Sequence, residues 1–361
     1  MPPPRWPKPG WKRHYWPKGP RCTSRRSPLA RHKESSMTQD ERFDNRPRVR
    51  KRILNPLPQN PETSSSSEDA VVGKGRFPSW LHRKLPKGGD LWKTSKVLGE
   101  KRLHTVCEEA RCPNLTECWS KKTATFLVLG KDCTRACGFC DIDFNAQPAA
   151  PDPEEPAKVA ASVRQLDLTH VVITMVARDD LDDGGAGHLA AILRAVRTER
   201  PDCTLEILTS DFQGKHSSLD TVLAENPDVF NYNLETVREL TPRVRHTATY
   251  DRTLDVLRYA KSKRSEGFIK SGIMVGLGET EEQVHQAIRD LKDAGCDIIT
   301  IGQYLQPNRH KLRVKSFVTP ETFKAYEDFG YSIGVKHMYC GPFVRSSYNA
   351  DLFTKDFKKS A

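Results

Sequence analysis

The sequence predicts an α/β fold organised as a partial, TIM-like (β/α)6 barrel with extensions at both ends. Two observations support this class. From residue 124 onward, short runs of apolar and β-branched residues alternate with amphipathic runs of helical period. Such alternation is typical of parallel strands connected through helices. The chain, at 361 residues, is also long enough for one barrel-sized domain.

The expected strands and helices follow one another regularly along the chain. The expected strands are Thr125–Leu129, His170–Val176, Thr204–Leu208, Val229–Asn233, Phe268–Val275 and Asp297–Gly302. Helical patterns fill most of the gaps, at Glu154–Leu166, His188–Arg197, Arg252–Lys263 and Glu281–Ala294. Functional groups of a barrel gather where its strands end. We therefore expect the site at the carboxyl ends of these strands.

Four regions are expected. Residues 1–75 form a basic tail rich in Pro, Arg and Ser, whose composition predicts disorder. Residues 76–123 form an N-terminal extension whose cysteine-bearing segment is expected to be a loop, and residues 124–335 form the barrel. Residues 336–361 form a C-terminal extension.

Charge is concentrated in the tail. Residues 1–60 hold 16 Lys+Arg against 4 Asp+Glu, whereas residues 61–361 hold 42 of each. The folded part therefore carries no nucleic-acid signal. No run is long and apolar enough to predict a membrane span, and the first residues contain no signal-peptide pattern.

The basic tail has two interpretations, a targeting peptide and a dispensable solvated extension. Eleven prolines in residues 1–60 argue against the amphipathic helix of a transit peptide. We therefore expect a cytoplasmic protein. A mitochondrial or plastid location is the alternative if the tail is a transit peptide.

Two cysteine triplets stand close together in the sequence. The first triplet, C-x4-C-x5-C, is Cys107, Cys112 and Cys118, and the second triplet, C-x3-C-x2-C, is Cys133, Cys137 and Cys140. Three soft thiolates suit an iron–sulfur cluster and leave a fourth coordination position to be explained. Clustered cysteines in a chain of this length indicate metal binding in a reducing compartment rather than a disulfide scaffold.

The second triplet directly follows the first expected strand, and Phe139 precedes Cys140. Three cysteines can hold three irons of a 4Fe–4S cluster and leave the fourth iron open. This combination resembles the radical S-adenosylmethionine (SAM) superfamily. The resemblance implies that the open iron chelates SAM, which one electron cleaves to a 5′-deoxyadenosyl radical. A zinc site is the alternative for the cysteines alone.

The first triplet and several short motifs along residues 77–350 indicate one family within this superfamily. The sequences FPSWLHRKLPKG, LHTVCEEARCPNLTECW, VARDDLDDGGA, NYNLETV, MVGLGETEEQ, GQYLQP and GPFVRSSYNA resemble lipoyl synthases, while the tail falls outside the resemblance. The family inserts two sulfur atoms, at C6 and C8, into an octanoyl chain on a lysine of a carrier protein. The resemblance implies two SAM molecules per lipoyl group and a second, auxiliary 4Fe–4S cluster that is consumed as the sulfur source.

The resemblance also assigns residues to roles. Cys133, Cys137 and Cys140 hold the SAM-binding cluster. Cys107, Cys112 and Cys118 hold the auxiliary cluster, whose fourth ligand is Ser347 of the Arg345-Ser346-Ser347-Tyr348 motif. An alkoxide is a hard ligand among soft thiolates, which suits a cluster that must come apart.

Further SAM contacts are expected from Phe139, Gly184, Gly185, Asn233 and Glu235. The alternatives are a simple strand-to-helix turn for the two glycines and an ordinary helix N-terminus for Asn233 and Glu235. The Arg178-Asp179-Asp180 run could be a substrate clamp or a surface ion-pair cluster.

The resemblance implies three kinds of partner. The substrate is an octanoylated lipoyl domain of a 2-oxo acid dehydrogenase (its E2 component) or the glycine-cleavage H protein. A ferredoxin or flavodoxin delivers electrons, and an iron–sulfur assembly or carrier protein rebuilds the sacrificed cluster. Neither a nucleic acid nor a membrane is expected.

Two other functions could use clustered cysteines. Another sulfur-inserting radical enzyme would spread its auxiliary ligands over several strands, whereas here they lie in one N-terminal segment. A basic, zinc-containing nucleic-acid-binding protein would use four ligands per site and carry its charge on the folded domain.

Overall fold

Eight strands form one sheet, in the order β1-β2-β5-β6-β7-β8-β9-β10, in a computed structural model of the chain. The structure describes residues 77–82, 95–99, 103–120 and 125–347. The expected disordered tail, residues 1–75, lies outside these described residues. The strands of the large sheet are β1 (His104–Thr105), β2 (Thr125–Val128), β5 (His170–Met175), β6 (Thr204–Leu208), β7 (Val229–Asn231), β8 (Phe268–Val275), β9 (Ile298–Gln303) and β10 (His337–Gly341).

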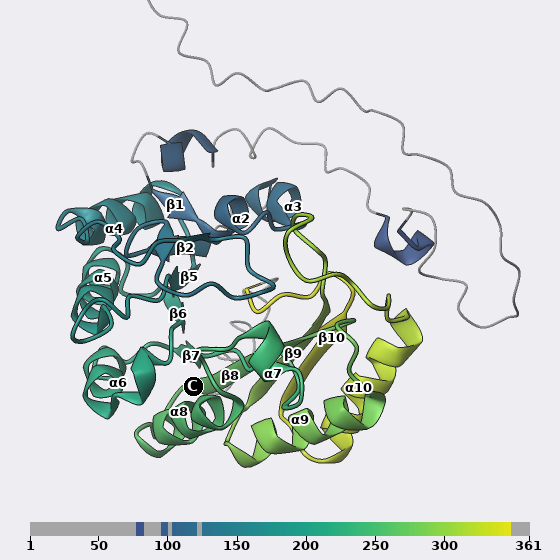
Figure 1. Cartoon of the computed structure of the whole chain (residues 1–361). Coiled ribbons are helices and arrows are strands. Elements are labelled where there is room, and N and C mark those ends of the chain that lie inside the picture. The colour runs from purple at the N-terminus through teal and green to yellow at the C-terminus, as the bar shows by residue number, and fades with distance from the viewer. Residues whose placement is uncertain (1–76, 83–94, 100–102, 121–124, 348–361) are drawn as a thin grey trace, which may run out of the picture. The chain divides into compact units, whose positions relative to one another are not determined.

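Seven of these strands run parallel, from β2 to β10, and β1 pairs antiparallel with β2 at one edge. The helices that connect the parallel strands lie on the outer face of the curved sheet (Figure 1). These helices are α4 (Glu155–Gln165), α5 (Ala186–Glu199), α6 (His216–Leu223), α8 (Tyr250–Ser262), α9 (Glu281–Asp293) and α10 (Pro320–Ser332). The described chain is thus a partial parallel α/β barrel.

Local sequence explains where the outer helices begin. Thr249 caps α8 and Thr319 caps α10, since each side-chain oxygen accepts a backbone N–H of the first turn. Thr280 and Gln283 form a complete capping box at the start of α9. Each helix then turns an apolar face to the sheet, as α9 does with Val284, Ile288 and Leu291. Burial of these faces against the strands makes the main core.

Several short elements complete the described chain. They are the 3-10 turns η1 (Ser79–Leu81) and η2 (Phe212–Gly214), the helices α2 (Val106–Glu109), α3 (Leu115–Ser120) and α7 (Thr241–Val244), and the two-residue strands β3 (Asp132–Cys133) and β4 (Asp143–Phe144). Within the described ranges, every helix is too short or too polar to cross a membrane.

The predicted class, a partial TIM-like α/β barrel, is confirmed, and all six predicted strands are present with ends shifted by no more than two residues. The count was one strand short. β10 pairs parallel with β9 over the whole of His337–Gly341, inside the region that we assigned to the C-terminal extension. Helix α10, which we did not predict, carries the chain back to the sheet, so this additional βα unit continues the barrel.

The first cysteine segment was also expected to be a loop, and this expectation was wrong. Thr105 caps α2 by accepting the backbone N–H of Glu108 at 3.3 Å. Cys107 therefore lies on α2 and Cys118 on α3. Pro113 lies in the turn between the two short helices, where its lack of a backbone N–H interrupts no helical hydrogen bond.

Candidate active site

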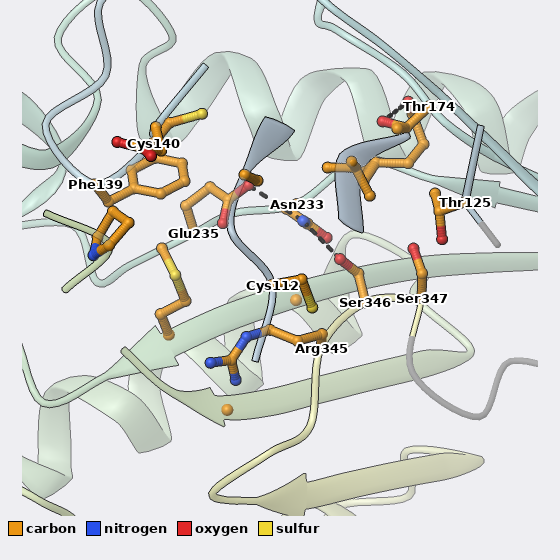
Figure 2. Close-up of a pocket in the computed structure, with 18 of the residues that line it drawn as sticks. Cys112, Thr125, Phe139, Cys140, Thr174, Asn233, Glu235, Arg345, Ser346 and Ser347 are labelled. Atoms are coloured by element: carbon orange, nitrogen blue, oxygen red, sulfur yellow. Dashed lines mark hydrogen bonds between the residues drawn. The ribbon is translucent and has the colours of Figure 1, made fainter. Parts of the chain in front are cut away.

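One cavity of about 670 Å³ lies inside the sheet, at the carboxyl-terminal side of the strands. Thr174 of β5, Leu208 of β6, Asn233 just after β7, Met274 of β8 and Gly302 of β9 all line it. Parallel strands bring their carboxyl ends to one edge, so residues far apart in sequence share this wall. Figure 2 shows Asn233 in the middle of this wall, between Glu235 and Ser346, with Thr174 and Thr125 farther to the right.

Both cysteine triplets reach this cavity. Cys107, Cys112 and Cys118 of the first triplet line it, as do Cys133 and Cys140 of the second. Cys137 is not part of the lining, but its thiol lies close enough to Cys133 and Cys140 for the three to interact electrostatically. The structure thus brings together, at one site, cysteines that the sequence placed in two separate motifs.

Arg135, between Cys133 and Cys137, fixes the loop of the second triplet. Its guanidinium donates to Asp179 at 2.7 Å and to the fully buried Asp211 at 2.6 Å. Burial alone would raise the pKa of Asp179, but the hydrogen bond and charge of Arg135 outweigh it, and the pKa is lowered. The segments after β5 and β6 therefore hold the cysteine loop through a buried ion-pair network.

The backbone of the same loop is held on two sides. Thr134 donates from both its N–H and its hydroxyl to the carbonyl of Ala177, each at 3.0 Å. Gly138 donates to Val244 O at 3.0 Å and accepts from Leu312 N at 3.0 Å. A Cβ on Gly138 would come within 3.1 Å of the Leu312 side chain, which is tighter than an ordinary contact, so glycine suits this close approach.

Phe139 packs its ring into a small apolar cluster with Val244, Leu277, Tyr304 and Leu312. It lines the cavity beside Cys140, as Figure 2 shows. Phe139 thus lies at the cavity beside Cys140, and its contact with SAM stays a prediction.

The C-terminal serines lie in the same cavity as the first triplet. Asn114, between Cys112 and Cys118, donates its side-chain N–H to Phe343 O at 2.8 Å and so ties the two segments together. Ser346 and Ser347 follow Phe343 and both line the cavity (Figure 2). An oxygen donor is therefore available on the side of the cavity that the first triplet occupies.

Asn233 and Glu235 occupy the wall between the triplets. Asn233 donates to Glu235 Oε1 and to Ser346 Oγ, each at 3.1 Å, and Arg245 Nη1 holds its backbone carbonyl at 2.7 Å. The Asn233 Oδ1 atom is buried and has no hydrogen-bond partner among the described residues. Burial raises the pKa of Glu235, although Arg245 and Asn233 oppose the shift. No described helix begins at either residue, so the helix N-terminus alternative does not hold.

Gly184 and Gly185 lie in the turn before α5, outside the cavity lining. Both have left-handed backbone, with φ of 65° and 88°. A Cβ on Gly185 would come within 2.5 Å of Leu129. The strand-to-helix turn accounts for both glycines, and the structure does not bring them to the other predicted contacts.

The Arg178-Asp179-Asp180 run is neither the clamp nor the surface cluster that we considered. Arg178 is buried and donates to both oxygens of Asp180 at 2.8 Å and to Leu129 O at 3.1 Å. Asp179 accepts from Arg135 instead. The run is thus a structural network around the buried Arg178, and its half-buried Asp179 supports the loop of the second triplet.

The donor set fits iron–sulfur clusters. Burial raises the pKa of Cys137 to about 11 and that of Cys140 to about 12, so bare thiolates are disfavoured there. A bound metal centre reverses this preference because its positive charge stabilises the thiolate. Among the described residues, no three His, Cys, Asp or Glu side chains converge on a position for a single metal ion. A cubic cluster holds its ligands farther apart than one ion does.

Some site residues were not selected from the sequence. Arg135, Asp211, Asn114 and Asp141 each hold a cysteine-bearing segment in place. Three of them lie within or beside the cysteine motifs, and this proximity was the only sequence signal for their role: Arg135, Asn114 and Asp141. Asp211 gave none, because its contact with Arg135 joins residues 76 positions apart.

The chain matches two family models and several individual proteins along most of its length. Residues 127–291 match the model of the radical SAM superfamily, and residues 22–112 match that of the N-terminal domain of lipoyl synthase of the same superfamily. Lipoyl synthase of Protochlamydia amoebophila (strain UWE25) is 62% identical over 312 residues, which cover 86% of this chain and 95% of that protein. Lipoyl synthase of Chlamydia felis (strain Fe/C-56) is 53% identical over 277 residues, which cover 77% of this chain and 88% of that protein.

The match of the N-terminal model begins at residue 22. Most of the tail therefore falls inside the family's N-terminal region, and our expectation that the whole tail lies outside the resemblance was wrong. Low-complexity, Pro-rich sequence hid this relationship, since it offers few distinctive words.

Proposed function

The chain belongs to the lipoyl synthase family of the radical SAM superfamily, and on this premise we propose how its two cysteine triplets divide the reaction. Its activity is the insertion of two sulfur atoms into a protein-bound octanoyl chain, with SAM and 4Fe–4S clusters as cofactors. The residue assignments below are the proposal. The observation that carries it is the arrangement of both triplets and Ser347 around one cavity.

Cys133, Cys137 and Cys140 are proposed to hold the cluster that binds SAM. Three thiols leave one iron open, which is what a chelating substrate requires. The Arg135 network and the backbone bonds of Gly138 keep this loop rigid, so its thiols stay oriented for ligation. Phe139 shields the site from water on one side.

Cys107, Cys112, Cys118 and Ser347 are proposed to hold the auxiliary cluster. The Asn114 contact to Phe343 O supports this assignment because it draws the serine segment toward the first triplet. Ser346 is already engaged as an acceptor for Asn233, which favours Ser347 as the free oxygen donor. A serine oxygen among thiolates is the weaker ligand for a soft metal site.

When bound, the clusters and SAM supply a hydrogen-abstracting radical and the sulfur. The chain's own residues bind SAM and the clusters and orient them. Asn233 Oδ1 has an unused acceptor and Glu235 an oxygen at the cavity wall, so both are proposed to receive hydroxyl groups of SAM. Gly184 and Gly185 are proposed to support the SAM site from the turn before α5, where both have left-handed backbone.

The acyl substrate is proposed to enter among the apolar side chains of the cavity. Leu127, Ile273 and Met274 line it along with the polar groups. Saturated carbon has no acidic proton, so the reaction at the acyl chain needs a radical rather than a general base. Apolar side chains therefore suffice to hold the chain. The open end must admit a long lysine-plus-octanoyl arm while its carrier protein stays outside.

The partners are proposed from the activity. An octanoylated lipoyl domain of a 2-oxo acid dehydrogenase or a glycine-cleavage H protein presents the substrate. A ferredoxin or flavodoxin provides electrons, and an iron–sulfur carrier protein restores the auxiliary cluster. Relatives from Chlamydiae-type bacteria and the need for reduced thiols support a cytoplasmic location.

Anaerobic assay tests the function. The reconstituted chain is incubated with SAM, dithionite and an octanoyl-lysine peptide, and the peptide is weighed by mass spectrometry. We expect replacement of two hydrogens by two sulfurs. A peptide of unchanged mass, from protein that contains both clusters, would contradict the assignment.

A further inference from the structure

The segment from Gln306 to Lys315, which connects β9 to α10, holds an unusual excess of cations. Its sequence QPNRHKLRVK contains Arg309, Lys311, Arg313 and Lys315 and no acidic residue. Residues 61–361 as a whole carry equal numbers of basic and acidic side chains. None of these four cations forms an ion pair with a described acidic residue, and Arg309 contacts only the neighbouring His310. The charge is therefore local and unneutralised.

The segment alternates between inward and outward side chains. Leu312 and Val314 pack against the apolar cluster that contains Phe139 and Tyr304. Arg313 and Lys315, the residues between and after them, are exposed. Extended backbone turns successive side chains to opposite sides, so the packing of the half-buried Leu312 and Val314 turns Arg313 and Lys315 outward.

Backbone hydrogen bonds hold the segment firmly in this position. Leu312 N donates to Gly138 O at 3.0 Å, and Lys315 N donates to Gly276 O at 2.8 Å. Tyr304 Oη donates to Leu312 O at 2.8 Å, and Gln306 donates to Lys311 O at 2.9 Å. The cations thus stand on a rigid support, where binding a partner orders no loop.

The segment also borders the active-site cavity. Leu305, Gln306 and Pro307 line the cavity, and Asn308 donates to Asp141, the residue after Cys140. Arg243 adds an exposed cation from α7, whose Val244 packs in the same apolar cluster as Leu312. We call Arg243, Arg309, Lys311, Arg313 and Lys315 the basic strip.

We propose that the basic strip docks an acidic face of the octanoylated carrier domain. This inference rests on the proposed function, since it names the surface that positions the substrate protein. The acyl-lysyl arm must enter the cavity while the folded carrier remains at its rim, and the strip lies on that rim. Clustered cations without partners of their own attract an opposite charge and orient it during encounter. A reductant has no such constraint, because an electron can cross protein from another side.

A substrate pair tests the proposal. The triple variant Lys311→Glu, Arg313→Glu, Lys315→Glu is assayed with dithionite on an octanoylated glycine-cleavage H protein and on a short octanoyl-lysine peptide. We expect the KM for the H protein to rise about tenfold or more, since rim charges act mainly on association. Turnover at saturation and the KM for the peptide should stay within about twofold, because both substrates use the same cavity.

A matched control separates local from general charge effects. Lys292→Glu, Arg258→Glu, Lys324→Glu reverses three exposed cations on α9, α8 and α10, on the outer face of the sheet. Breaking surface pairs there costs little stability. We expect this control to bind the H protein like the unaltered enzyme.

Equilibrium binding of the octanoylated H protein, measured without SAM, gives a readout that needs no turnover. The affinity should fall in the strip variant and should decrease with added salt in the unaltered protein. Equal loss for peptide and H protein, equal loss in the control variant, or a defect only with flavodoxin as reductant would overturn the proposal. If the unaltered enzyme thiolates neither substrate, the proposed function fails, while the binding measurement still decides the strip.

Discussion

Arg111 and Asp141 form an ion pair that joins the two cysteine triplets. The Arg111 Nε atom lies 2.8 Å from Asp141 Oδ2, and the Asp141 side chain is only 6% exposed. Arg111 directly precedes Cys112, and Asp141 directly follows Cys140. Asn308 donates to the other oxygen of Asp141. The Asp141 carboxylate therefore links the segments of the two proposed clusters directly, in addition to the sheet pairing of β1 with β2.

Replacing Arg111 with Ala tests this dependence. Because the Arg111 side chain is 63% exposed, the free energy of unfolding should change by less than about 1 kcal/mol. Reaction geometry is less tolerant, since a shift of about 1 Å can cost roughly a hundredfold in rate. We expect SAM cleavage to persist while sulfur inserted per deoxyadenosine falls about tenfold, measured by chromatography and mass spectrometry.

Arg164→Ala is the matched control for Arg111→Ala. Arg164 is 64% exposed and pairs with Glu199 at 2.9 Å on the outer helices. The ratio of sulfur to deoxyadenosine should remain unchanged in this variant. A similar loss in both variants would mean that the Arg111–Asp141 pair has no special role.

Removing one cysteine from each triplet should separate the two chemistries. Cys137→Ala is expected to abolish deoxyadenosine formation, because the SAM-binding cluster lacks a ligand. Cys112→Ala is expected to keep deoxyadenosine formation and lose sulfur insertion. Iron should fall from about eight to about four per chain in either variant, as two 4Fe–4S clusters become one. Deoxyadenosine from the Cys137→Ala protein would refute the division of labour.

The fourth ligand of the auxiliary cluster can be identified by neighbouring serine variants. Ser347→Ala should lower the iron content and stop sulfur insertion, since an oxygen donor is lost. Ser347→Cys should retain iron but release sulfur more slowly, because a thiolate binds the soft site more strongly. Ser346→Ala removes an acceptor of Asn233 and should keep the iron. If iron were lost in Ser346→Ala but retained in Ser347→Ala, Ser346 would be the ligand and the Ser347 assignment would be contradicted.

The Arg135–Asp179 pair predicts a specific dependence of stability on pH. The folded pKa of Asp179 is lowered below its unfolded value of about 3.9. Its contribution is therefore present above that pH and is lost as the pH falls through the folded pKa. In Asp179→Asn, the free energy of unfolding should decline less between about pH 5 and pH 3, measured by urea denaturation. Asp202→Asn, at an exposed position, should follow the unaltered protein.

Much of the fold could be predicted because its signals are local. Buried apolar runs such as Thr204–Leu208 and Phe268–Val275 matched β6 and β8 at both ends. Helix α6 and strand β10 were missed because His216–Leu223 is short and rich in Ser, and HMYCG resembles a loop. Their packing against other elements stabilises them more than intrinsic propensity does.

The cysteines of the site were also predictable, since metal ligands follow fixed spacings. The residues that hold them in place were not. Asn114 meets Phe343 across 229 positions, and Arg135 meets Asp211 across 76. Such contacts depend on the barrel bringing distant segments together. Left-handed backbone before α5 favours glycine at both Gly184 and Gly185 whether or not SAM lies beside them, so the sequence could not separate a turn from a cofactor contact there.

Isotopic labelling of the cluster sulfide, combined with the Cys112→Ala variant, tests the central claim most directly. The chain is reconstituted with iron and heavy sulfide, freed of excess sulfide, and allowed one turnover on an octanoyl-lysine peptide. If the cluster on Cys107, Cys112, Cys118 and Ser347 is the sulfur source, both inserted sulfur atoms should be heavy, and Cys112→Ala should insert none. Light sulfur in the product of the labelled protein, or continued insertion by Cys112→Ala, would contradict the account.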